Sequence, residues 1–334
     1  MLPRDVIIIG AGPAGLAAAI AAKQHGLDYT VLEKGVLVNS LYHFPTHMMF
    51  FTTPERLEIG GIPFITPYEK PTRVESLRYY RRVTDVYELM IELGEHVTAV
   101  QAPQAGRTET FTVETRSVEG KTRRLESRTV VLAIGCYDHP NLMGIPGEQL
   151  PHVSHYYDDA HRYYRKRVII VGGKNSAAEA ALELYRAGAH PTLVHRQAEL
   201  GGSIKYWVRP DIENRISEGS IPARFETRLL EIRPKDVVVE HGGRQDVLPA
   251  DHVLLMTGYL TDPTLMRQVG VRLDPKTLVP EHSADTFESN VPGFYIAGTA
   301  LTGVHSGRIF IENGRFHGQV VVDAIRQRLA SVEA

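Results

Sequence analysis

The chain has 334 residues, which favours two domains over one. Hydrophobic and charged fractions of 43% and 23% are those of an ordinary globular protein, and a net charge of −2 excludes a general basic field for nucleic acid or anionic membrane. The single cysteine, Cys136, excludes an intrachain disulfide framework and favours a cytoplasmic protein, and no apolar run is long enough to predict a membrane span.

Residues 5–33 predict a complete β-α-β unit around a glycine motif. Residues 6–9 are an unbroken apolar run, typical of a parallel strand buried on both faces, and Gly10, Gly12 and Gly15 follow in G-x-G-x-x-G spacing. These glycines permit a tight turn, the approach of a pyrophosphate, and close helix packing, in that order. A second strand over residues 29–32 ends at Glu33, whose carboxylate can bind a ribose hydroxyl, so we predict a dinucleotide here.

Residues 34–64 form a long irregular stretch that is too apolar for an exposed loop and contains Thr52 and Thr53. Its aromatic and methionine side chains would suit the edge of a flat ring system. The alternative is a loop that only packs the domain.

A helix is predicted after Thr72, because Thr72 and Glu75 form a capping box ahead of a 3.6-period apolar face that extends to residue 91. Residues 95–100 should then add a strand to the parallel sheet. Residues 110–115 and 123–134 alternate polar and apolar side chains, which predicts a small antiparallel excursion ending at Gly135.

Residues 144–148 are rich in turn formers and predict a crossover between domains. Acidic and histidine side chains follow at a spacing that matches no closed zinc pattern, so we expect a solvated hinge segment and no metal. These side chains are His152, His155, Asp158, Asp159 and His161.

Residues 167–196 repeat the first unit, with Gly172 and Ala177 at the outer positions of G-x-G-x-x-A. Lys174 replaces the middle glycine, so its side chain must point away from a pyrophosphate or replace part of the pyrophosphate's backbone contacts. Asn175 and Ser176 begin the helix and offer free N–H groups and a capping side chain.

The second strand of this unit ends at His195 and Arg196 instead of an acid. An arginine pairs with a 2′-phosphate that a carboxylate would repel. The first unit is therefore interpreted as binding FAD or NAD and the second as binding NADPH, with Lys205 a possible second phosphate contact and solvent exposure the alternative for Arg196.

The remaining elements are a short helix over 209–217, short strands within 221–255, an apolar strand over 291–298 and a terminal helix over 309–329. The terminal helix should pack on the first domain, which makes the second nucleotide unit an insertion. We predict an α/β fold of two Rossmann-like domains, each with a small antiparallel β excursion. The FAD domain would comprise residues 1–150 and 288–334, and the NADPH domain residues 151–287.

Two nucleotide units, with strands ending at residues 133–135 and 297–298, resemble flavoproteins with two dinucleotide-binding domains, and the domain lengths are similar to those of low-molecular-weight thioredoxin reductases. Four segments resemble the bacillithiol-disulfide reductase family over nearly the whole chain. They are VGGKNSAAEAALELYRAGA, SIKYWVRPDIENRI, TFESNVPGFYIAG and IFIENGRFHG.

The resemblance implies FAD on the first unit, NADPH on the second, and a homo-oligomer. By family motif, the residues implied for FAD are Gly10, Gly12, Gly15, Glu33, Val97 and Gly298, and those implied for NADPH are Gly172, Asn175, Ser176, His195 and Arg196. We also assign to the FAD site Pro13, Ala14, Lys34, Ser40, Thr52, Gly135, Thr299 and Ile309. To the NADPH site we add Lys174, Ala177, Lys205 and Gly258.

Two positions depart from the family pattern. Thr299 stands where an aspartate usually follows the glycine, and Ala14 stands where Firmicute members have a cysteine. The chain also lacks the C-x-x-C pair of thioredoxin reductases, and Cys136 is expected to be a buried reduced thiol.

The resulting hypothesis is an NADPH-dependent FAD reductase that passes hydride to the flavin and on to a low-molecular-weight disulfide similar to bacillithiol disulfide. No catalytic side chain is assigned, because the cofactors carry the chemistry. The partner would be a small-molecule disulfide or a small redox protein, with no nucleic acid and no membrane. The alternatives are a ferredoxin– or flavodoxin–NADP reductase, a flavin monooxygenase, and a slow-turnover nucleotide-binding redox sensor.

Overall fold

The computed structural model describes residues 2–104 and 109–333 and divides the chain into two compact units. The first unit contains residues 1–43, 48–139 and 259–334, and the second contains residues 44–47 and 140–258. This division differs from the expected boundaries at 150/151 and 287/288. Met143 and Ile145 pack against the core of the second unit, whereas Met266 is buried in the core of the first.

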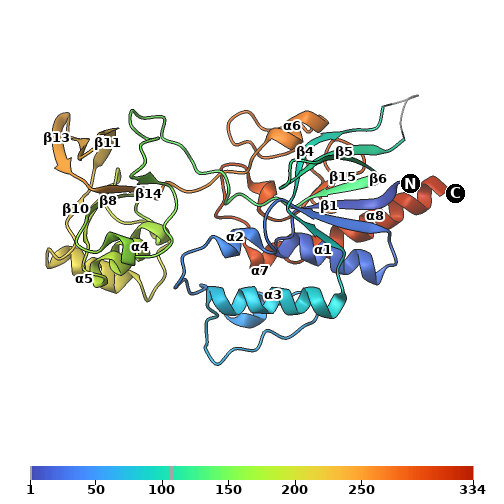
Figure 1. The fold of residues 1–334 in the computed structure, drawn as a ribbon, viewed down its shortest axis with the longest axis horizontal. Coiled ribbons are helices and arrows are strands. Elements are labelled where there is room, and N and C mark those ends of the chain that lie inside the picture. The colour runs from blue at the N-terminus through green and yellow to red at the C-terminus, as the bar shows by residue number, and fades with distance from the viewer. Residues whose placement is uncertain (1, 105–108, 334) are drawn as a thin grey trace. The chain divides into compact units, whose positions relative to one another are not determined.

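The first unit is built on a parallel sheet in the order β3-β2-β1-β6, with β15 on the other side of β6. Strands β1, β6 and β15 of this sheet are labelled in Figure 1. Val6 and Ile8 alternate with Ile7 and Ile9 along β1, and all four are buried, as expected for a central strand covered on both faces. The strands are β1 (Arg4–Ile9), β2 (Tyr29–Glu33), β3 (Ile91–Leu93), β6 (Thr122–Leu132) and β15 (Phe294–Ile296).

The strand expected at 95–100 in the parallel sheet was misplaced. Helix α3 (Arg73–Tyr87) ends with Glu88 as its C-cap, so the following residues of β3 are free to pair with β2 in parallel. Gly94, with φ of +73°, then turns the chain into β4 (Glu95–Gln101), which pairs antiparallel with β5 (Phe111–Ser117).

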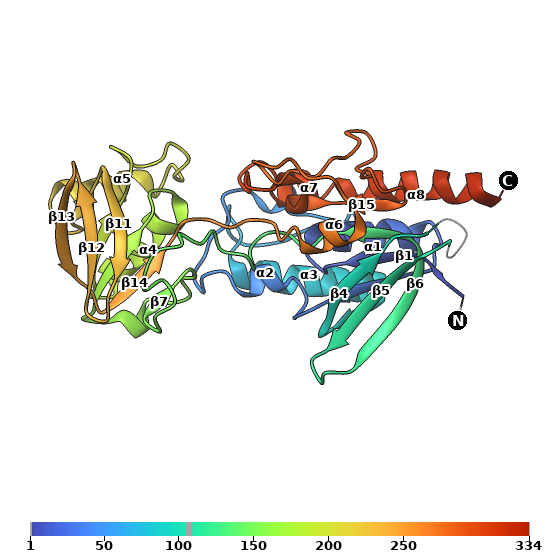
Figure 2. The same cartoon turned by 90° about the horizontal axis from the view of Figure 1, so that it is seen from above.

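Strand β6 belongs to two kinds of pairing. Its first half pairs antiparallel with β5, from Thr122 to Ser127, and its second half pairs in parallel with β1 and β15, up to Leu132. An antiparallel excursion was therefore predicted, but with different bounds: it also includes β4, and only the first half of β6 belongs to it. Figure 2 shows it extending from the parallel strands.

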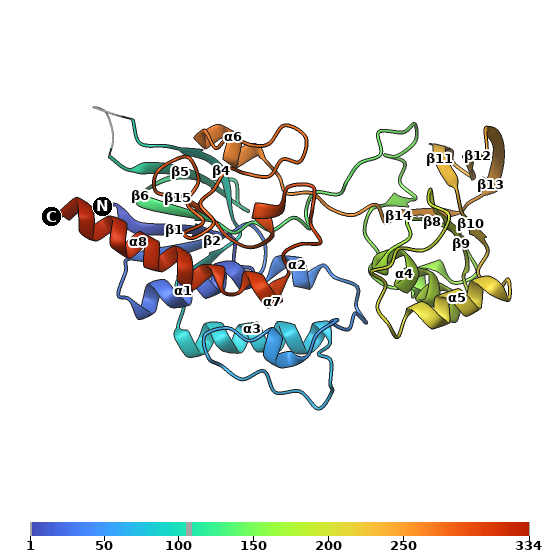
Figure 3. The same cartoon turned by 180° about the vertical axis from the view of Figure 1, so that it is seen from behind.

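The helices of the first unit pack on this sheet and on one another. The capping box of α3 is confirmed, with Thr72 accepting from the Glu75 amide and Glu75 accepting from the Thr72 amide. Helix α1 (Pro13–Gln24) lies beside α8 (His317–Glu333), as Figure 3 shows, so the terminal helix does return to the first unit. The shorter helices are α2 (Asn39–Tyr42), η1 (Pro54–Arg56), α6 (Thr264–Val269), η3 (Gly298–Thr302) and α7 (Ile311–Gly314).

The second unit has a parallel sheet in the order β10-β9-β8-β14-β7 and a separate antiparallel sheet of β11, β12 and β13. Helix α4 (Asn175–Arg186) begins at the predicted residue, α5 (Arg209–Ser217) has the predicted bounds, and η2 spans His161–Tyr163. The parallel strands are β7 (Val153–Ser154), β8 (Arg167–Val171), β9 (His190–Val194), β10 (Ala223–Arg224) and β14 (His252–Leu255). The antiparallel strands are β11 (Thr227–Ile232), β12 (Asp236–His241) and β13 (Arg244–Pro249).

None of the helices within the described residues combines the length and apolar character that crossing a membrane requires.

Candidate dinucleotide sites

The three glycines of the first unit occupy three different environments. Gly10 has φ of +107°, and a Cβ there would stand 2.5 Å from the carbonyl oxygen of Ala133. A Cβ on Gly15 would collide with the Gly10 carbonyl, so α1 packs directly on the turn. A Cβ on Gly12 would meet nothing within 4 Å. Gly12 therefore leaves open space at the start of α1, where a phosphate group would approach the backbone.

The start of α1 is electrostatically suited to an anion. Gly12 is its N-cap in an extended conformation, no side chain caps the helix, and Pro13 follows at the first position. The free N–H groups of a helix start attract negative charge when no protein side chain satisfies them. The residues present thus fit a dinucleotide pyrophosphate.

Glu33 is buried at the end of β2, with 6% of its surface exposed. One carboxylate oxygen accepts from the Ala11 amide at 2.9 Å and the other accepts from the Gly35 amide at 2.9 Å. Burial raises the pKa of Glu33, and these two hydrogen bonds oppose the shift. The carboxylate is fixed beside the glycine turn, and its remaining lone pairs can accept from a ribose hydroxyl.

The turn after β15 lies against the first glycine motif. Gly298 has φ of +69°, and a Cβ there would stand 2.9 Å from the Cβ of Ala14. A Cβ on Gly135 would stand 3.6 Å from the Thr299 hydroxyl and 4.0 Å from the Ser40 hydroxyl. Five of the residues assigned to FAD from the sequence, on four separate segments, are thus brought together.

The other residues assigned to FAD lie at varied depths. Lys34 forms an ion pair with Asp138 at 2.9 Å. Ile309 packs close to Gly314, while Thr52 is partly buried in the segment that follows α2. Val97 is buried in the core beside a register shift of β4. None of these contacts joins Thr52 or Val97 to the glycine turn.

The apolar segment 34–64 packs largely on α3. The hydroxyl of Tyr80 donates to the carbonyl of Leu57 at 2.9 Å, and that of Tyr79 donates to the carbonyl of Ile62 at 2.9 Å. Phe64 stacks on Tyr79 with ring centroids 4.4 Å apart. Residues 57–64 therefore follow the packing alternative, whereas Met49 and Phe51 are exposed.

Cys136 is a free, partly buried thiol directly after Gly135. Burial raises its pKa, and a hydrogen bond with the Thr299 side chain opposes the shift. A thiol with a raised pKa is a poor nucleophile at neutral pH. The geometry supports the expected reduced, unreactive thiol, with more exposure than predicted.

In the second unit, Gly172 and Gly173 both lie where a side chain has no room. A Cβ on Gly172, whose φ is +150°, would stand 2.7 Å from the Met256 carbonyl oxygen and 3.0 Å from the Cβ of Ala177. A Cβ on Gly173 would collide with the ring of His195. The turn therefore packs tightly between β14, α4 and the end of β9.

The start of α4 is organised by a loop that follows β9. Lys174 is the N-cap in an extended conformation without a capping side chain, and a Cβ on Gly201 would stand 3.1 Å from its Cγ. The Asn175 amide group donates to the Ser203 carbonyl at 2.9 Å and accepts from the Lys205 backbone amide at 2.8 Å. The Asn175 side chain therefore holds Ser203 and Lys205 instead of capping the helix.

Arg196 is exposed at the end of β9 and forms no ion pair among the described residues. The adjacent His195 ring packs edge-on against Phe225 with centroids 6.5 Å apart. Burial, and secondarily the Arg196 charge, lowers the pKa of His195. A neutral imidazole beside a free guanidinium leaves Arg196 as the cation available to a phosphate. Ser176 and Gly258 are exposed as well.

The role considered for Lys205 needs a correction. Its side chain is buried, and its Nζ lies 2.6 Å from Glu179 Oε1 and 5.7 Å from the centroid of the Trp207 ring. Burial raises the pKa of Glu179, and the charge of Lys205 opposes the shift. Because its ammonium already pairs with a carboxylate, we no longer assign Lys205 to the phosphate.

The histidine and acidic cluster near residue 155 forms pairs. His155 Nε2 lies 3.3 Å from the buried carboxylate of Glu148, and His47 Nε2 lies 3.7 Å from Asp159. Within residues 2–104 and 109–333, no group of three or more histidine, cysteine, aspartate or glutamate side chains is arranged to hold a metal ion.

Sequence reasoning missed His317, the first residue of α8. It is buried, and its Nδ1 accepts from the Gly298 amide at 3.2 Å. The available signal was its position between Gly314 and Gly318, because a glycine pair in a helical segment indicates close backbone packing.

Comparisons with known proteins show the family and the fold of the chain. Residues 7–298 match the family described as pyridine nucleotide-disulphide oxidoreductase. Bacilliredoxin reductase Bdr of Bacillus subtilis is 42% identical over 98% of this chain and 99% of its own length. Bacillithiol disulfide reductase Bdr (YpdA) from Bacillus cereus is a solved structure with 39% identity and a TM-score of 0.94, covering 98% of this chain and all of its own. Thioredoxin reductase of T. acidophilum shares the fold, with a TM-score of 0.76 and 19% identity. The match covers 98% of this chain and 99% of that one.

Proposed function

Because the chain belongs to the pyridine nucleotide-disulphide oxidoreductase family, we propose that it reduces a low-molecular-weight disulfide with NADPH through a bound FAD. The relative from Bacillus cereus is named for bacillithiol disulfide, and we take that molecule as the substrate to test. The family and the two-unit fold make the chain an oxidoreductase that uses FAD and a nicotinamide dinucleotide.

One observation carries the proposal: each unit presents a glycine turn ahead of a helix that no side chain caps. In the first unit Gly12 leaves the approach open, and Glu33 is fixed beside the turn. We assign FAD there, with Gly298 and Thr299 at the same turn. In the second unit the exposed Arg196 supports NADPH over NADH.

When bound, FAD supplies an acceptor for hydride and a donor of two electrons. In the net reaction, one NADPH and one proton reduce one disulfide to two thiols, and NADP⁺ leaves. The protein binds and orients the two dinucleotides through the residues named above. The described residues contain one cysteine, whose raised pKa does not suit exchange, so we propose that the disulfide reacts without a mixed disulfide on the protein.

We propose the reducing cytoplasm as the compartment, with which a single cysteine is consistent. We also propose a homo-oligomer whose subunits associate without disulfide bonds.

The decisive experiment measures anaerobic NADPH oxidation by the flavin-loaded protein with bacillithiol disulfide. We expect turnover with one NADPH consumed for every two thiols formed, at a rate well above NADPH oxidation by oxygen alone. Equal rates would contradict the substrate, and faster reduction of a ferredoxin would favour a ferredoxin–NADP reductase instead.

The matched control is Cys136→Ser. Because the proposal gives Cys136 no redox role, this variant should reduce the disulfide at a rate within about twofold of the wild-type rate. A loss of disulfide reduction, with flavin reduction by NADPH unchanged, would show that the thiol takes part.

A further inference from the structure

His317 is held in one protonation state by the group that it binds. Its Nδ1 lies 3.2 Å from the backbone nitrogen of Gly298, which can only donate. Nδ1 therefore accepts, and the ring proton lies on Nε2. A ring protonated at both nitrogens could not make this bond. Burial, and secondarily the charge of His282, lowers the pKa of His317 to about 4, in agreement with the geometry.

The His317 ring is also held by stacking. It stacks on Phe287 with centroids 4.2 Å apart and planes 20° apart, and Phe287 stacks on His282 at 6.3 Å and 30°. Phe287 is in turn tied to β15, because the amide of Ile296 donates to its carbonyl at 3.0 Å. The stack on Phe287 and the hydrogen bond with the Gly298 amide together fix the plane of the His317 ring.

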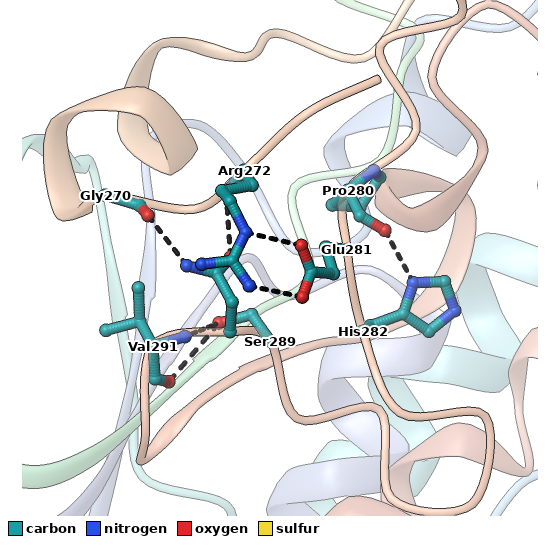
Figure 4. Close-up of polar contacts among 8 residues, drawn as sticks. Gly270, Arg272, Pro280, Glu281, His282, Ser289 and Val291 are labelled. Atoms are coloured by element: carbon teal, nitrogen blue, oxygen red, sulfur yellow. Dashed lines mark hydrogen bonds and ion pairs between the residues drawn. The ribbon is translucent and has the colours of Figure 1, made fainter.

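The segment that carries Phe287 is braced by polar contacts, which Figure 4 shows. Arg272 makes two hydrogen bonds to the Glu281 carboxylate, one of them from Nε at 2.6 Å. His282 donates from Nδ1 to the Pro280 carbonyl at 2.7 Å, because a carbonyl oxygen can only accept. The Ser289 hydroxyl donates to the Val291 carbonyl at 3.3 Å.

Glycines bring the backbone close on both sides of His317. A Cβ on Gly314 would stand 3.4 Å from the Cα of Gly298. A Cβ on Gly318 would collide with the backbone of α1 at Ala17 and Ala18. The first turn of α8 is thereby packed on α1, and the end of α7 is packed on the Gly298 turn.

We propose that His317 is a positioning residue of the FAD site. It accepts the Gly298 amide and so holds the turn after β15 against Ala14, which sets the position of Gly298 and Thr299 relative to the flavin. This inference rests on the proposed function, because it concerns the site assigned to FAD. It assigns no chemical step to the histidine.

Two variants distinguish the effect of losing the hydrogen-bond acceptor at Nδ1 from the effect of losing the aromatic ring. In His317→Asn, Oδ1 occupies the place of Nδ1 and can still accept from Gly298. In His317→Gln, the amide lies near the position of Nε2 and leaves the Gly298 amide without a partner. Both variants lose the aromatic stack on Phe287, so they differ chiefly in the hydrogen bond.

The experiment measures FAD affinity by titration of the apoprotein, and the visible spectrum and midpoint potential of the bound flavin at saturating FAD. Because a buried amide without an acceptor is destabilising, His317→Gln should weaken FAD binding by about tenfold and shift the flavin spectrum and potential. His317→Asn should stay within about threefold of the wild type, with a wild-type spectrum. A purely structural role for the ring would affect both variants alike.

The outcomes distinguish a failure of the positioning role of His317 from a failure of the proposed function. If the wild type binds FAD and the two variants match it, or if both lose FAD equally, the role of the Nδ1 acceptor is overturned while the proposed function stands. If the wild type binds no FAD, both fail. A rescue by asparagine and not by glutamine supports the inference.

Discussion

Ala14 and Gly298 are in such close contact that a Cβ on Gly298 would stand 2.9 Å from the Ala14 Cβ. Ala14 belongs to the first turn of α1, and Gly298 begins the turn that follows β15. The contact joins an early and a late segment of the first unit at the site assigned to FAD. It leaves no space for a larger side chain at position 298.

Gly298→Ala should therefore weaken both the fold and FAD binding. The added methyl group meets Ala14, and the positive φ of Gly298 is unfavourable for alanine, so we expect a loss of about 1–3 kcal/mol in the free energy of unfolding. Urea unfolding and FAD titration check this. Adding Ala14→Gly should restore part of the loss, and a double variant no better than the single one would show that backbone strain acts alone.

Arg196→Gln should discriminate between the two nicotinamide dinucleotides. Removing a charge-assisted contact to the 2′-phosphate should raise the NADPH KM about tenfold or more and leave the NADH KM unchanged. Stopped-flow flavin reduction with each nucleotide gives the measurement. Arg244→Gln, at another exposed arginine of the second unit, is the matched control. Equal effects on NADPH and NADH would contradict the phosphate role.

The pair of Lys205 and Glu179 should matter for stability and not for nucleotide choice. Lys205→Met leaves the Glu179 carboxylate unpaired, and because that side chain is 30% exposed we expect a loss of about 1–3 kcal/mol in unfolding free energy. Combining it with Glu179→Gln should recover part of this loss in a double-mutant cycle. A raised NADPH KM with unchanged stability would return Lys205 to the phosphate.

Acid should destabilise the protein through His317. Its pKa in the native state is lowered from 6.5 to about 4 by burial and by His282, which faces it across Phe287. The unfolded chain therefore binds a proton that the native chain does not, so this stabilisation is complete above pH 6.5 and is lost as the pH falls toward 4. Between pH 7 and pH 4 the wild type should lose about 2–3 kcal/mol more than His317→Asn. Urea titrations at both pH values check this, and parallel losses would contradict it.

Short sequence patterns predicted strands and helices correctly where each pattern is compatible with only one kind of element. The run before Gly10 became β1, and the Thr72–Glu75 box became the start of α3, because strand burial and helix capping are decided within a few residues. The apolar period of that helix continued to residue 91 in the sequence. The helix nevertheless stops at Glu88, and residues 91–93 join the sheet through contacts that no local pattern encodes.

Site residues were also predicted correctly where the pattern is contiguous, and missed or misassigned where their partners lie far along the chain. Gly10, Gly12 and Gly15 take the environments expected for a phosphate turn, because the motif is contiguous. Lys205 and His317 could not be placed from the sequence, since their partners Glu179 and Gly298 lie on other elements. A capping pair such as Thr72 and Glu75 can be predicted because its members are three residues apart, whereas partners far apart in the chain are identified only in the folded structure.

The placement of β15 beside β6 bears on how the protein acquires its cofactor. Phe294 pairs with Val130, and residues 140–258 of the second unit lie between them in the chain. On the ribosome the first glycine motif emerges early, but its sheet lacks its last parallel strand, and Gly298 is absent, until nearly all of the polypeptide has been synthesised. With Gly298 assigned to the FAD site, we expect flavin binding to follow the synthesis of β15, and a chain that ends before β15 should bind FAD more weakly than the full chain.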